Sequence, residues 1–453
     1  MGVVGTDVWM YNSWISDGEK VGFTQDFSHT NQDTHDMSLR TLMFGWEYPP
    51  FHSGGLGVAC QGLVRGLLKH GIHVSLVLPN GNAETEENLD VLSPVEKHFS
   101  SLNIKHVKSI LQPYDDVISY AARMKRLALS RKTPKDVQEL YGPDLGDAVE
   151  HFTALSIAMT EDLNPDIVHC HDWMTYEAGI RAAAFHRTPL VTHIHATEFD
   201  RTDNHPNPWI AERERRGLLA SDRVIAVSHY TKGMLVDRYG IPSDKISVIH
   251  NGHDVPHDSH PHVLTSQYGL TKGPLVLFLG RLTVQKNPWQ FLDVARRVRD
   301  YRSDAQFVMA GDGPMLGALV DRACELGLSD SVIFTGKLNR AEVNALFRRA
   351  DCFVMPSLSE PFGLVALEAI GHGTPVILSK QSGVAEVGEH GFKVDFWDTD
   401  KMSDCILTVL REEPLADQLR TEAPNVLRRL TWKNQAGRVR SIYEDLLNDY
   451  TRL

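Results

Sequence analysis

Short runs of apolar and β-branched residues alternate with longer segments of helical periodicity from Leu42 almost to the end of the chain. In the first half, such runs predict strands at 41–46, 72–78, 104–109, 166–169, 189–194, 223–228 and 246–250. In the second half they predict strands at 275–280, 306–310, 331–335, 351–355 and 375–378. The repeated order of strand, helix and strand predicts an α/β protein whose parallel sheets are covered by helices on both faces.

The chain is too long for a single sheet of this kind. Its 453 residues exceed the roughly 250–300 residues that one hydrophobic core usually serves. Residues 251–274 interrupt the pattern with Gly, Pro, Asp and His, which predicts a break between domains. We therefore expect two doubly wound, Rossmann-like domains that face each other across a cleft. The expected boundaries are a mobile tail at 1–36, a first domain at 37–255, a linker at 256–274, a second domain at 275–430 and a closing helix at 431–453.

Composition narrows the class of protein. Apolar residues make up 42% and charged residues 23%, as in ordinary globular proteins. The net charge of −12 disfavours a nucleic-acid partner, because phosphate binding needs an excess of Lys and Arg. We expect no membrane span and no secretory signal, since the sequence shows neither pattern. The five cysteines are scattered, with no CxxC pair, which favours reduced thiols and a cytoplasmic location.

In open parallel sheets, ligands bind beyond the carboxyl ends of the strands, so residues directly after strands are the first candidates for a site. The segment EYPPFHSGGLG, from Glu47 to Gly57, follows the first predicted strand and leads into a helix. Glycines at a helix entrance let backbone N–H groups approach an anion. An ordinary strand–helix turn is the alternative. The GxGxxG spacing of a dinucleotide-binding loop is absent here, and also after Gly311, where Leu316 takes the sixth position. A dehydrogenase is therefore disfavoured.

Two cations, Arg281 and Lys286, follow the predicted strand at 275–280. Fixed at a strand end, they would clamp a diphosphate and neutralise the charge that grows as it departs. A solvated basic loop is the alternative.

Two carboxylates, Glu360 and Glu368, follow the predicted strand at 351–355. If all eight steps between them were helical, the rise would separate them by roughly 12 Å, beyond the roughly 5–9.5 Å of a glycosidase pair. We expect Glu360 to precede a helix and Glu368 to lie within it, so that each holds a different group of hydroxyls. The amides of Gly363, Leu364 and Val365 would begin that helix and meet a phosphate. Unrelated loop and helix-surface acids are the alternative.

Histidines gather after two first-half strands, in HCHDW at 169–173 and HIHATEF at 193–199. Alternation places His193 and His195 on one face, although a strand-end histidine is commonly a structural residue. The His–Cys–His run suggests zinc, but adjacent strand positions face opposite ways and converge poorly on one ion. The five histidines between 250 and 262 are a weak signal. We therefore expect no metal site.

Taken together, these residues resemble family 4 of the retaining glycosyltransferases, whose two-domain GT-B fold is shared with bacterial and archaeal glycogen and starch synthases. The resemblance runs from about Leu42 to Leu447. It comprises EYPPFHSGGLG, HDW, THIHATEF, VIAVSHYTKG, VIHNG, the Arg–Lys pair, the Glu-x7-Glu segment and a closing helix that begins LTWKN. The order of these motifs and their strand-end placement make the set specific.

The resemblance implies a role for each matching position in the donor site. Arg281 and Lys286 would bind the diphosphate of a nucleotide-sugar. Glu360 would hold the hydroxyls of the transferred sugar, and Glu368 would hold the ribose. Gly55, with Gly57 close by, would lie over the phosphates.

The resemblance also implies how the reaction proceeds. His195 would line the reacting centre near the 6-hydroxyl of the sugar, and Asp172 would lie close to the acceptor. The anomeric configuration would be retained, with the departing phosphate taking the proton of the acceptor. No cofactor and no divalent metal would be needed, because Arg281 and Lys286 take the place of the metal. The closing helix would cross back onto the first domain.

Several functions fit this pattern. The leading hypothesis is elongation of an α-1,4-glucan, as in glycogen or starch, with glucose donated by ADP-glucose or UDP-glucose. The second is transfer to a cell-envelope or lipid-linked glycan, with peripheral membrane contact through the basic residues of 121–135. A catalytically dead glycan-binding protein is disfavoured, because Arg281, Lys286 and Glu360 are all present. A phosphorylase that uses no nucleotide stays open on fold alone.

Deleting the residues before Met37 is expected to leave stability and turnover nearly unchanged, because the tail has no periodic apolar positions and Met37 lies just before the first predicted strand, four residues from its start. Thermal melting and turnover of the truncated chain test this. A melting temperature lowered by more than a few degrees, or a loss of turnover, would contradict the prediction.

Overall fold

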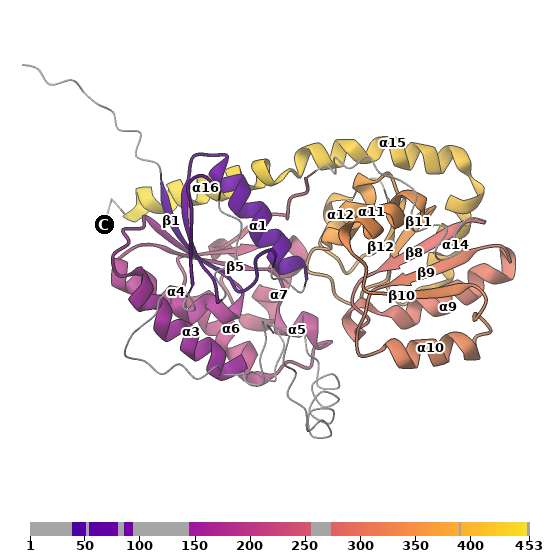
Figure 1. Cartoon of the computed structure of the whole chain (residues 1–453), viewed down its shortest axis with the longest axis horizontal. Helices are drawn as coiled ribbons and strands as arrows, with labels where there is room; N and C mark the ends of the chain where they lie inside the picture. Colours follow the sequence, from indigo (N-terminus) through magenta and orange to yellow (C-terminus); the bar gives the residue numbers. More distant parts are fainter. Residues whose placement is uncertain are drawn as a thin grey trace, which may run out of the picture. The chain divides into compact units, whose positions relative to one another are not determined.

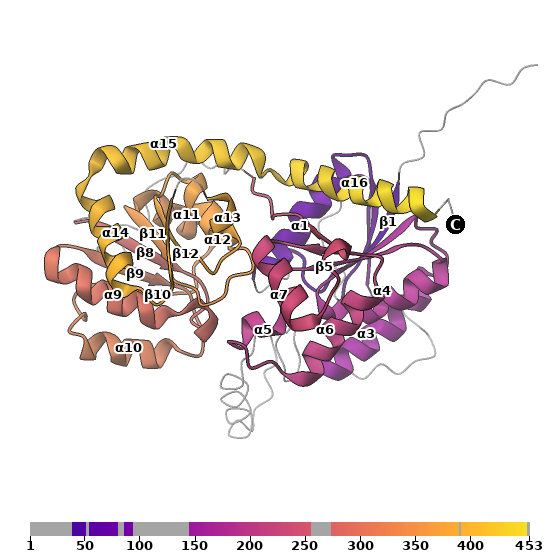
Figure 2. The ribbon, with the colours of Figure 1, turned by 180° about the vertical axis from the view of Figure 1, so that it is seen from behind.

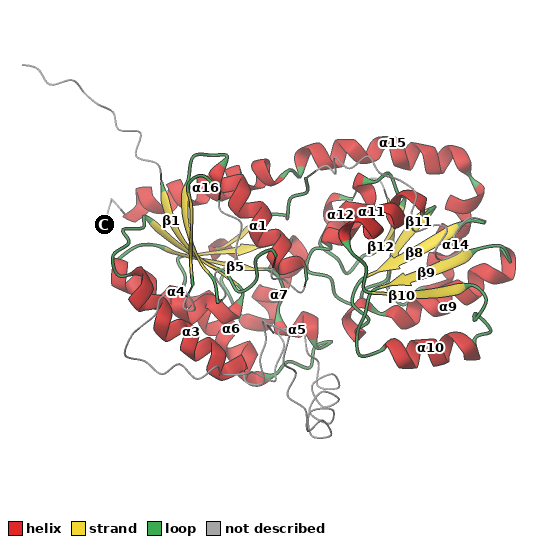
Figure 3. Ribbon diagram, viewed as in Figure 1, coloured by secondary structure: helices red, strands yellow, loops and turns green. Residues whose placement is uncertain are grey.

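The computed structural model describes residues 39–50, 54–79, 86–93, 145–254, 273–388 and 391–450. The expected tail at 1–36, the strand at 104–109, the basic stretch at 121–135 and most of the linker lie outside the described residues. Helices and strands alternate through the described part (Figure 3).

Two parallel sheets form the framework, which confirms the predicted fold class. The first has the order β3-β2-β1-β4-β5-β6-β7 and the second the order β10-β9-β8-β11-β12-β13. The first-sheet strands are β1 (Arg40–Phe44), β2 (His73–Val77), β3 (Leu89–Leu92), β4 (Ile167–His171), β5 (Leu190–Ile194), β6 (Arg223–Ala226) and β7 (Ile246–Val248). The second-sheet strands are β8 (Leu275–Leu279), β9 (Gln306–Ala310), β10 (Val332–Gly336), β11 (Cys352–Met355), β12 (Val376–Ser379) and β13 (Gly391–Val394).

Strand alternation divides the first sheet between two layers of helices. Leu42 and Phe44 of β1 face one core, and Met43 faces the other. The first core takes most of its helical residues from α3 (Leu145–Thr160), α4 (Trp173–His186), α6 (Pro208–Ala220) and α7 (His229–Tyr239). Figure 2 shows α3, α4 and α6 together. The other face packs against α1 (Gly55–Leu68) and α16 (Trp432–Tyr450). The short α5 (Glu198–Arg201) follows β5.

The second sheet is covered in the same way. One face packs against α9 (Pro288–Tyr301), α10 (Leu316–Glu325) and α14 (Thr399–Arg411). The other packs against α11 (Arg340–Arg349), α12 (Leu364–Gly371) and α15 (Glu413–Arg429). The short α13 (Val384–Val387) follows β12. None of the helices in the described ranges combines the length and the apolar character that crossing a membrane requires.

Two edge strands, β3 and β13, were not predicted from the sequence. Each has four residues and carries a charged side chain, Asp90 in LDVL and Lys393 in GFKV. An edge strand is paired on one side only and tolerates a charged residue. That residue interrupts the apolar run, which is then too short to predict a strand.

The last two helices belong to different sheets. Val426 and Leu427 of α15 lie in the core of the second sheet, whereas Val439 and Tyr443 of α16 lie in the core of the first. Figure 1 shows α16, in yellow, beside α1, in indigo. The approach of these two helices depends on Gly62, where an added Cβ would lie 2.1 Å from Cε2 of Trp432.

Replacing Gly62 by alanine is expected to destabilise the protein by about 1–3 kcal/mol, because the added methyl group overpacks a contact that has no room to yield. Gly233→Ala in α7 is the matched control, since a Cβ there meets nothing within 4 Å, and it is expected to stabilise by up to about 1 kcal/mol. Urea unfolding of both variants measures the difference. Equal midpoints would refute the close packing of α1 on α16.

Candidate active site

The strand order of each sheet reverses between two neighbouring strands, β1 and β4 in the first sheet and β8 and β11 in the second. Ligands of open parallel sheets bind beyond the carboxyl ends of the strands at such a reversal. The glycine loop follows β1 and Asp172 follows β4, while Arg281 follows β8 and Glu360 follows β11. Four of the motifs predicted from sequence therefore follow the four strands at the two reversals, and the motif with His195 follows the neighbouring strand β5.

The glycine loop lies next to residues of the second sheet. A Cβ built on Gly54 would be 3.7 Å from Nη2 of Arg281, and one built on Gly55 would be 3.6 Å from Cδ1 of Leu364. Leu364, the first residue of α12, also packs against the core that contains α1 and α16. The structure thus brings the loop, one of the two cations and the start of α12 together, although the loop is more than two hundred residues from the other two in sequence.

The second cation, Lys286, pairs with the first carboxylate. Lys286 ends the short 3-10 helix η2 (Val284–Lys286), and its Nζ donates to Oε2 of Glu360. The hydroxyl of Ser357 donates to the same oxygen over 3.3 Å. The Glu360 backbone is fixed as well, since its N–H donates to the carbonyl of Gln381 over 2.9 Å. A cation and an acceptor are therefore held side by side at the end of β11.

Glu368 lies inside α12 and Glu360 lies before it, as the sequence indicated. Glu368 accepts a hydrogen bond from Nη1 of Arg340 over 2.7 Å, a partner that the sequence did not suggest. Gly363 precedes the helix with a φ of 103°, a conformation that a side chain would strain. The first amides of α12, those of Leu364 and Val365 among them, have no acceptor within the helix and suit an anion.

Asp172 is a buried positioning residue. Its side chain is only 1% exposed, and its Oδ1 accepts from the backbone N–H of His195 over 2.7 Å. Burial raises the pKa of this carboxyl to about 6, against the opposing charge of Arg201. The backbone of Asp172 has φ 57° and ψ 167°, a region that usually requires glycine. The resemblance implies that Asp172 lies close to the acceptor, which stays a prediction; the structure adds that its carboxylate fixes the loop that carries His195.

His195 itself is held by a neighbouring ring. Its Nε2 lies 2.9 Å from Nδ1 of His171. Burial, followed by the charge of Arg201, lowers the pKa of His195 to about 3, so the ring is neutral at physiological pH. A neutral imidazole can donate or accept a hydrogen bond without adding charge to the site.

A buried ion cluster around Arg201 supports this loop, and sequence reasoning missed it. The guanidinium lies 3.5 Å from Oδ2 of Asp172, 3.7 Å from Oε2 of Glu198 and 3.0 Å from Oε1 of Glu214. Its Nη2 also donates to the carbonyl of Ala196 over 2.7 Å. The acidic and basic residues of HATEFDR were the available signal, but nothing in the spacing pointed to Glu214 on α6.

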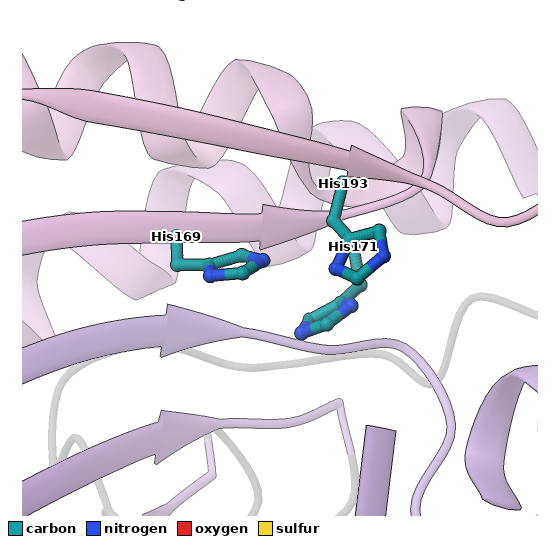
Figure 4. A group of neighbouring side chains, drawn as sticks. All are labelled: His169, His171 and His193. Atoms are coloured by element: carbon teal, nitrogen blue, oxygen red, sulfur yellow. The ribbon is translucent and has the colours of Figure 1, made fainter. Parts of the chain in front are cut away.

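The sequence argument about the histidines was wrong in one respect. It compared His169 with the adjacent Cys170, but His169 and His171 are two residues apart and share a face of β4. His193 on β5 pairs in register with His171. The three rings lie next to one another at the ends of these strands (Figure 4), and each buried ring offers a nitrogen within 4.8 Å of the others.

Comparison with known families identifies the class of protein that this fold and site define. A model for glycosyl transferases group 1 matches residues 265–426, and a model for glycosyltransferase family 4 matches residues 53–257. A D-inositol 3-phosphate glycosyltransferase of Acidothermus cellulolyticus is 30% identical over 65% of this chain and 71% of its own length. The chain belongs to glycosyltransferase family 4, with the GT-B fold, and is a glycosyltransferase.

Other relatives span nearly the whole chain. An uncharacterized glycosyltransferase of Methanocaldococcus jannaschii is 28% identical over 90% of this chain and 98% of its own. The glycogen synthase of Mycobacterium tuberculosis is 27% identical over 89% and 94%. Among solved structures, a sucrose-phosphate synthase from Thermosynechococcus elongatus (TM-score 0.66, 19% identity) and starch synthase IV from Arabidopsis thaliana bound to ADP and acarbose (0.65, 17%) share the fold. Each alignment covers 91% of this chain and 100% of the other.

Arg201→Met is expected to lower the free energy of unfolding by about 3–5 kcal/mol, because it leaves several buried carboxylates without their cation. Arg215→Met is the matched control, because that side chain is half exposed and only loosely paired with Glu212; it is expected to cost less than about 1 kcal/mol. Urea unfolding measures both. A loss below about 1 kcal/mol for Arg201→Met would show that the cluster does not stabilise the fold.

Proposed function

We propose that this glycosyltransferase transfers glucose from a nucleotide-sugar to a hydroxyl of an α-1,4-glucan, with retention of the anomeric configuration. The observation that carries the proposal is the convergence of Gly54 and Gly55, Arg281 and the start of α12, with the Lys286–Glu360 pair held after β11. A diphosphate needs cations and backbone amides, and a sugar needs fixed acceptors. The site supplies both kinds of group.

In the proposed reaction, the bond between the sugar C1 and the diphosphate oxygen breaks, and a bond from C1 to the acceptor oxygen forms on the same face. The acceptor proton passes to the departing diphosphate. Arg281 and Lys286 stabilise the charge that develops on the diphosphate, so no divalent metal is required for this step. Glu360 holds the sugar hydroxyls, and the neutral ring of His195 lines the reacting centre.

The glycogen synthase that aligns with 89% of the chain supports a glucan acceptor. A second candidate acceptor is an inositol phosphate, favoured by the relative that is 30% identical.

The distinguishing experiment presents ADP-glucose and UDP-glucose, each with glycogen, maltooligosaccharides, inositol 3-phosphate or a lipid-linked sugar, and measures the diphosphate released. Turnover with a glucan and an α-anomeric NMR signal in the product support the proposal. Turnover with inositol 3-phosphate or a lipid acceptor alone would refute it, as would a β-linked product.

Lys286→Ala is expected to lower kcat by about 10²–10³, because the charge on the departing diphosphate is greatest in the transition state. Steady-state kinetics at saturating donor measure the effect. Lys401→Ala, which removes an exposed lysine on α14, is the control and should leave kcat unchanged. A kcat for Lys286→Ala within about twofold of the parent would contradict the assignment.

Glu368→Ala is expected to raise the donor KM more than it lowers kcat, because the ribose that this carboxylate would hold does not react. Arg340→Ala should produce a smaller shift in the same direction, since Arg340 orients Glu368. Glu413→Ala, which removes an exposed carboxylate on α15, is the control. The assigned roles of the two residues would be refuted if Glu368→Ala lost turnover at saturating donor while Lys286→Ala left kcat unchanged.

A further inference from the structure

Three imidazole rings meet on the α1–α16 face of the first sheet, at the strand-order reversal. Those of His169 and His171 are 0% exposed and that of His193 is 3% exposed. His169 and His171 are alternate residues of β4, and His193 on the neighbouring strand β5 is paired in register with His171. The rings are 4.7–5.5 Å apart between centroids. Because strand register fixes all three positions, the cluster is part of the sheet framework.

Two of the rings are already oriented through one nitrogen each. Nδ1 of His169 is hydrogen-bonded to the hydroxyl of Tyr443 on α16, and Nδ1 of His171 to Nε2 of His195. Within the described part of the chain, Nε2 of both rings has no hydrogen-bond partner. Metal-ligating histidines characteristically use the second nitrogen in this way, since the outer hydrogen bond fixes the tautomer and the ring orientation.

The third ring, that of His193, lacks a hydrogen-bond partner among the described residues at both of its nitrogens, Nδ1 and Nε2. Burying a polar nitrogen without a partner destabilises a fold, and most buried polar atoms are therefore paired. A cation bound between the three rings would take up one free nitrogen of each ring, and the second nitrogen of His193 would stay without a hydrogen-bond partner among the described residues.

The protonation state suits an ion. Burial lowers the pKa of His169 to about 3. Burial and the neighbouring imidazoles place the pKa of His171 and His193 well below the usual value. Neutral imidazole is the form that ligates a metal. At a tetrahedral ion with Zn–N bonds of about 2.0–2.1 Å, the nitrogens would be about 3.3–3.4 Å apart, against up to 4.8 Å in the structure. The rings lie at 18–35° to one another, so binding one ion requires them to turn about their side-chain bonds until their lone pairs meet.

We propose that His169, His171 and His193 bind one divalent late transition-metal ion, with Zn²⁺ as the first candidate, at a structural site beside His195. Imidazole nitrogen is a preferred ligand of Zn²⁺ and of Co²⁺. The ion is separate from the donor site of Arg281 and Lys286, where no metal is invoked.

The ion would also set the tautomer of His195. With Nε2 of His171 on the metal, the remaining ring proton of His171 is on Nδ1, which then donates to Nε2 of His195. A neutral His195 that accepts at Nε2 carries its own proton on Nδ1. That nitrogen has no hydrogen-bond partner within the described residues, so the metal would leave His195 as a hydrogen-bond donor.

The direct test titrates the full-length, untagged protein with Co²⁺ after dialysis against a chelator. The expected result is saturation at about one equivalent, with the intense visible absorption of tetrahedral Co²⁺, and bleaching of that absorption by Zn²⁺. Binding should also raise the melting temperature. A titration that shows only weak octahedral absorption, or no saturation near one equivalent, would overturn the proposal without any variant.

Two variants locate the site. His193→Ala should abolish the tetrahedral spectrum, and Tyr443→Phe should weaken Co²⁺ affinity by about 10–100-fold through loss of the outer hydrogen bond to His169. His205→Ala, which removes an exposed histidine, is the control and should titrate like the parent. Circular dichroism in chelator-treated buffer establishes that each variant is folded. A folded His193→Ala that gives the parental spectrum would assign the ion to other residues and refute the proposal.

Discussion

The reversal of strand order in each parallel sheet is the constraint on which the rest of this structure depends. Parallel strands end at one edge, and at the reversal the connections to the helices diverge, so residues that follow β1 and β4, or β8 and β11, are not covered by a crossing segment. The glycine loop, the Arg281 loop and the Glu360 segment all begin there. Their chemistry differs, but their location has one cause.

Electrostatic balance decides how the groups at these strand ends are held. The Lys286–Glu360 pair places opposite charges in contact at the second sheet. In the first sheet, Arg201 balances buried carboxylates that would otherwise be costly to remove from water. Through Asp172, that cluster reaches the backbone of His195. The region around His195 is therefore stabilised by buried charged groups, of which Asp172 is the one expected to lie close to the acceptor.

The closing helices connect the C-terminal residues to both sheets. α15 packs in the core of the second sheet and α16 in the core of the first, where Trp432 requires a glycine at position 62. Tyr443 extends this connection from α16 to His169, and the histidine rings extend it to His195. Packing of the last helix and the orientation of a ring beside the proposed reacting centre are thus parts of one arrangement.

The sequence by itself determined the class of fold and the positions of most strands, because buried parallel strands read as apolar runs and turn residues separate them. It also placed Glu360 before a helix and Glu368 within one, since Pro361 and Gly363 mark where α12 begins. It did not reveal β3, β13, the Glu214–Arg201 pair or the partner of Glu368. Nor did it show that His169, His171 and His193 converge, because that depends on the register between β4 and β5. Neighbouring residues determine local periodicity. The register between strands and the pairing of buried charges are decided only when segments distant in sequence pack together.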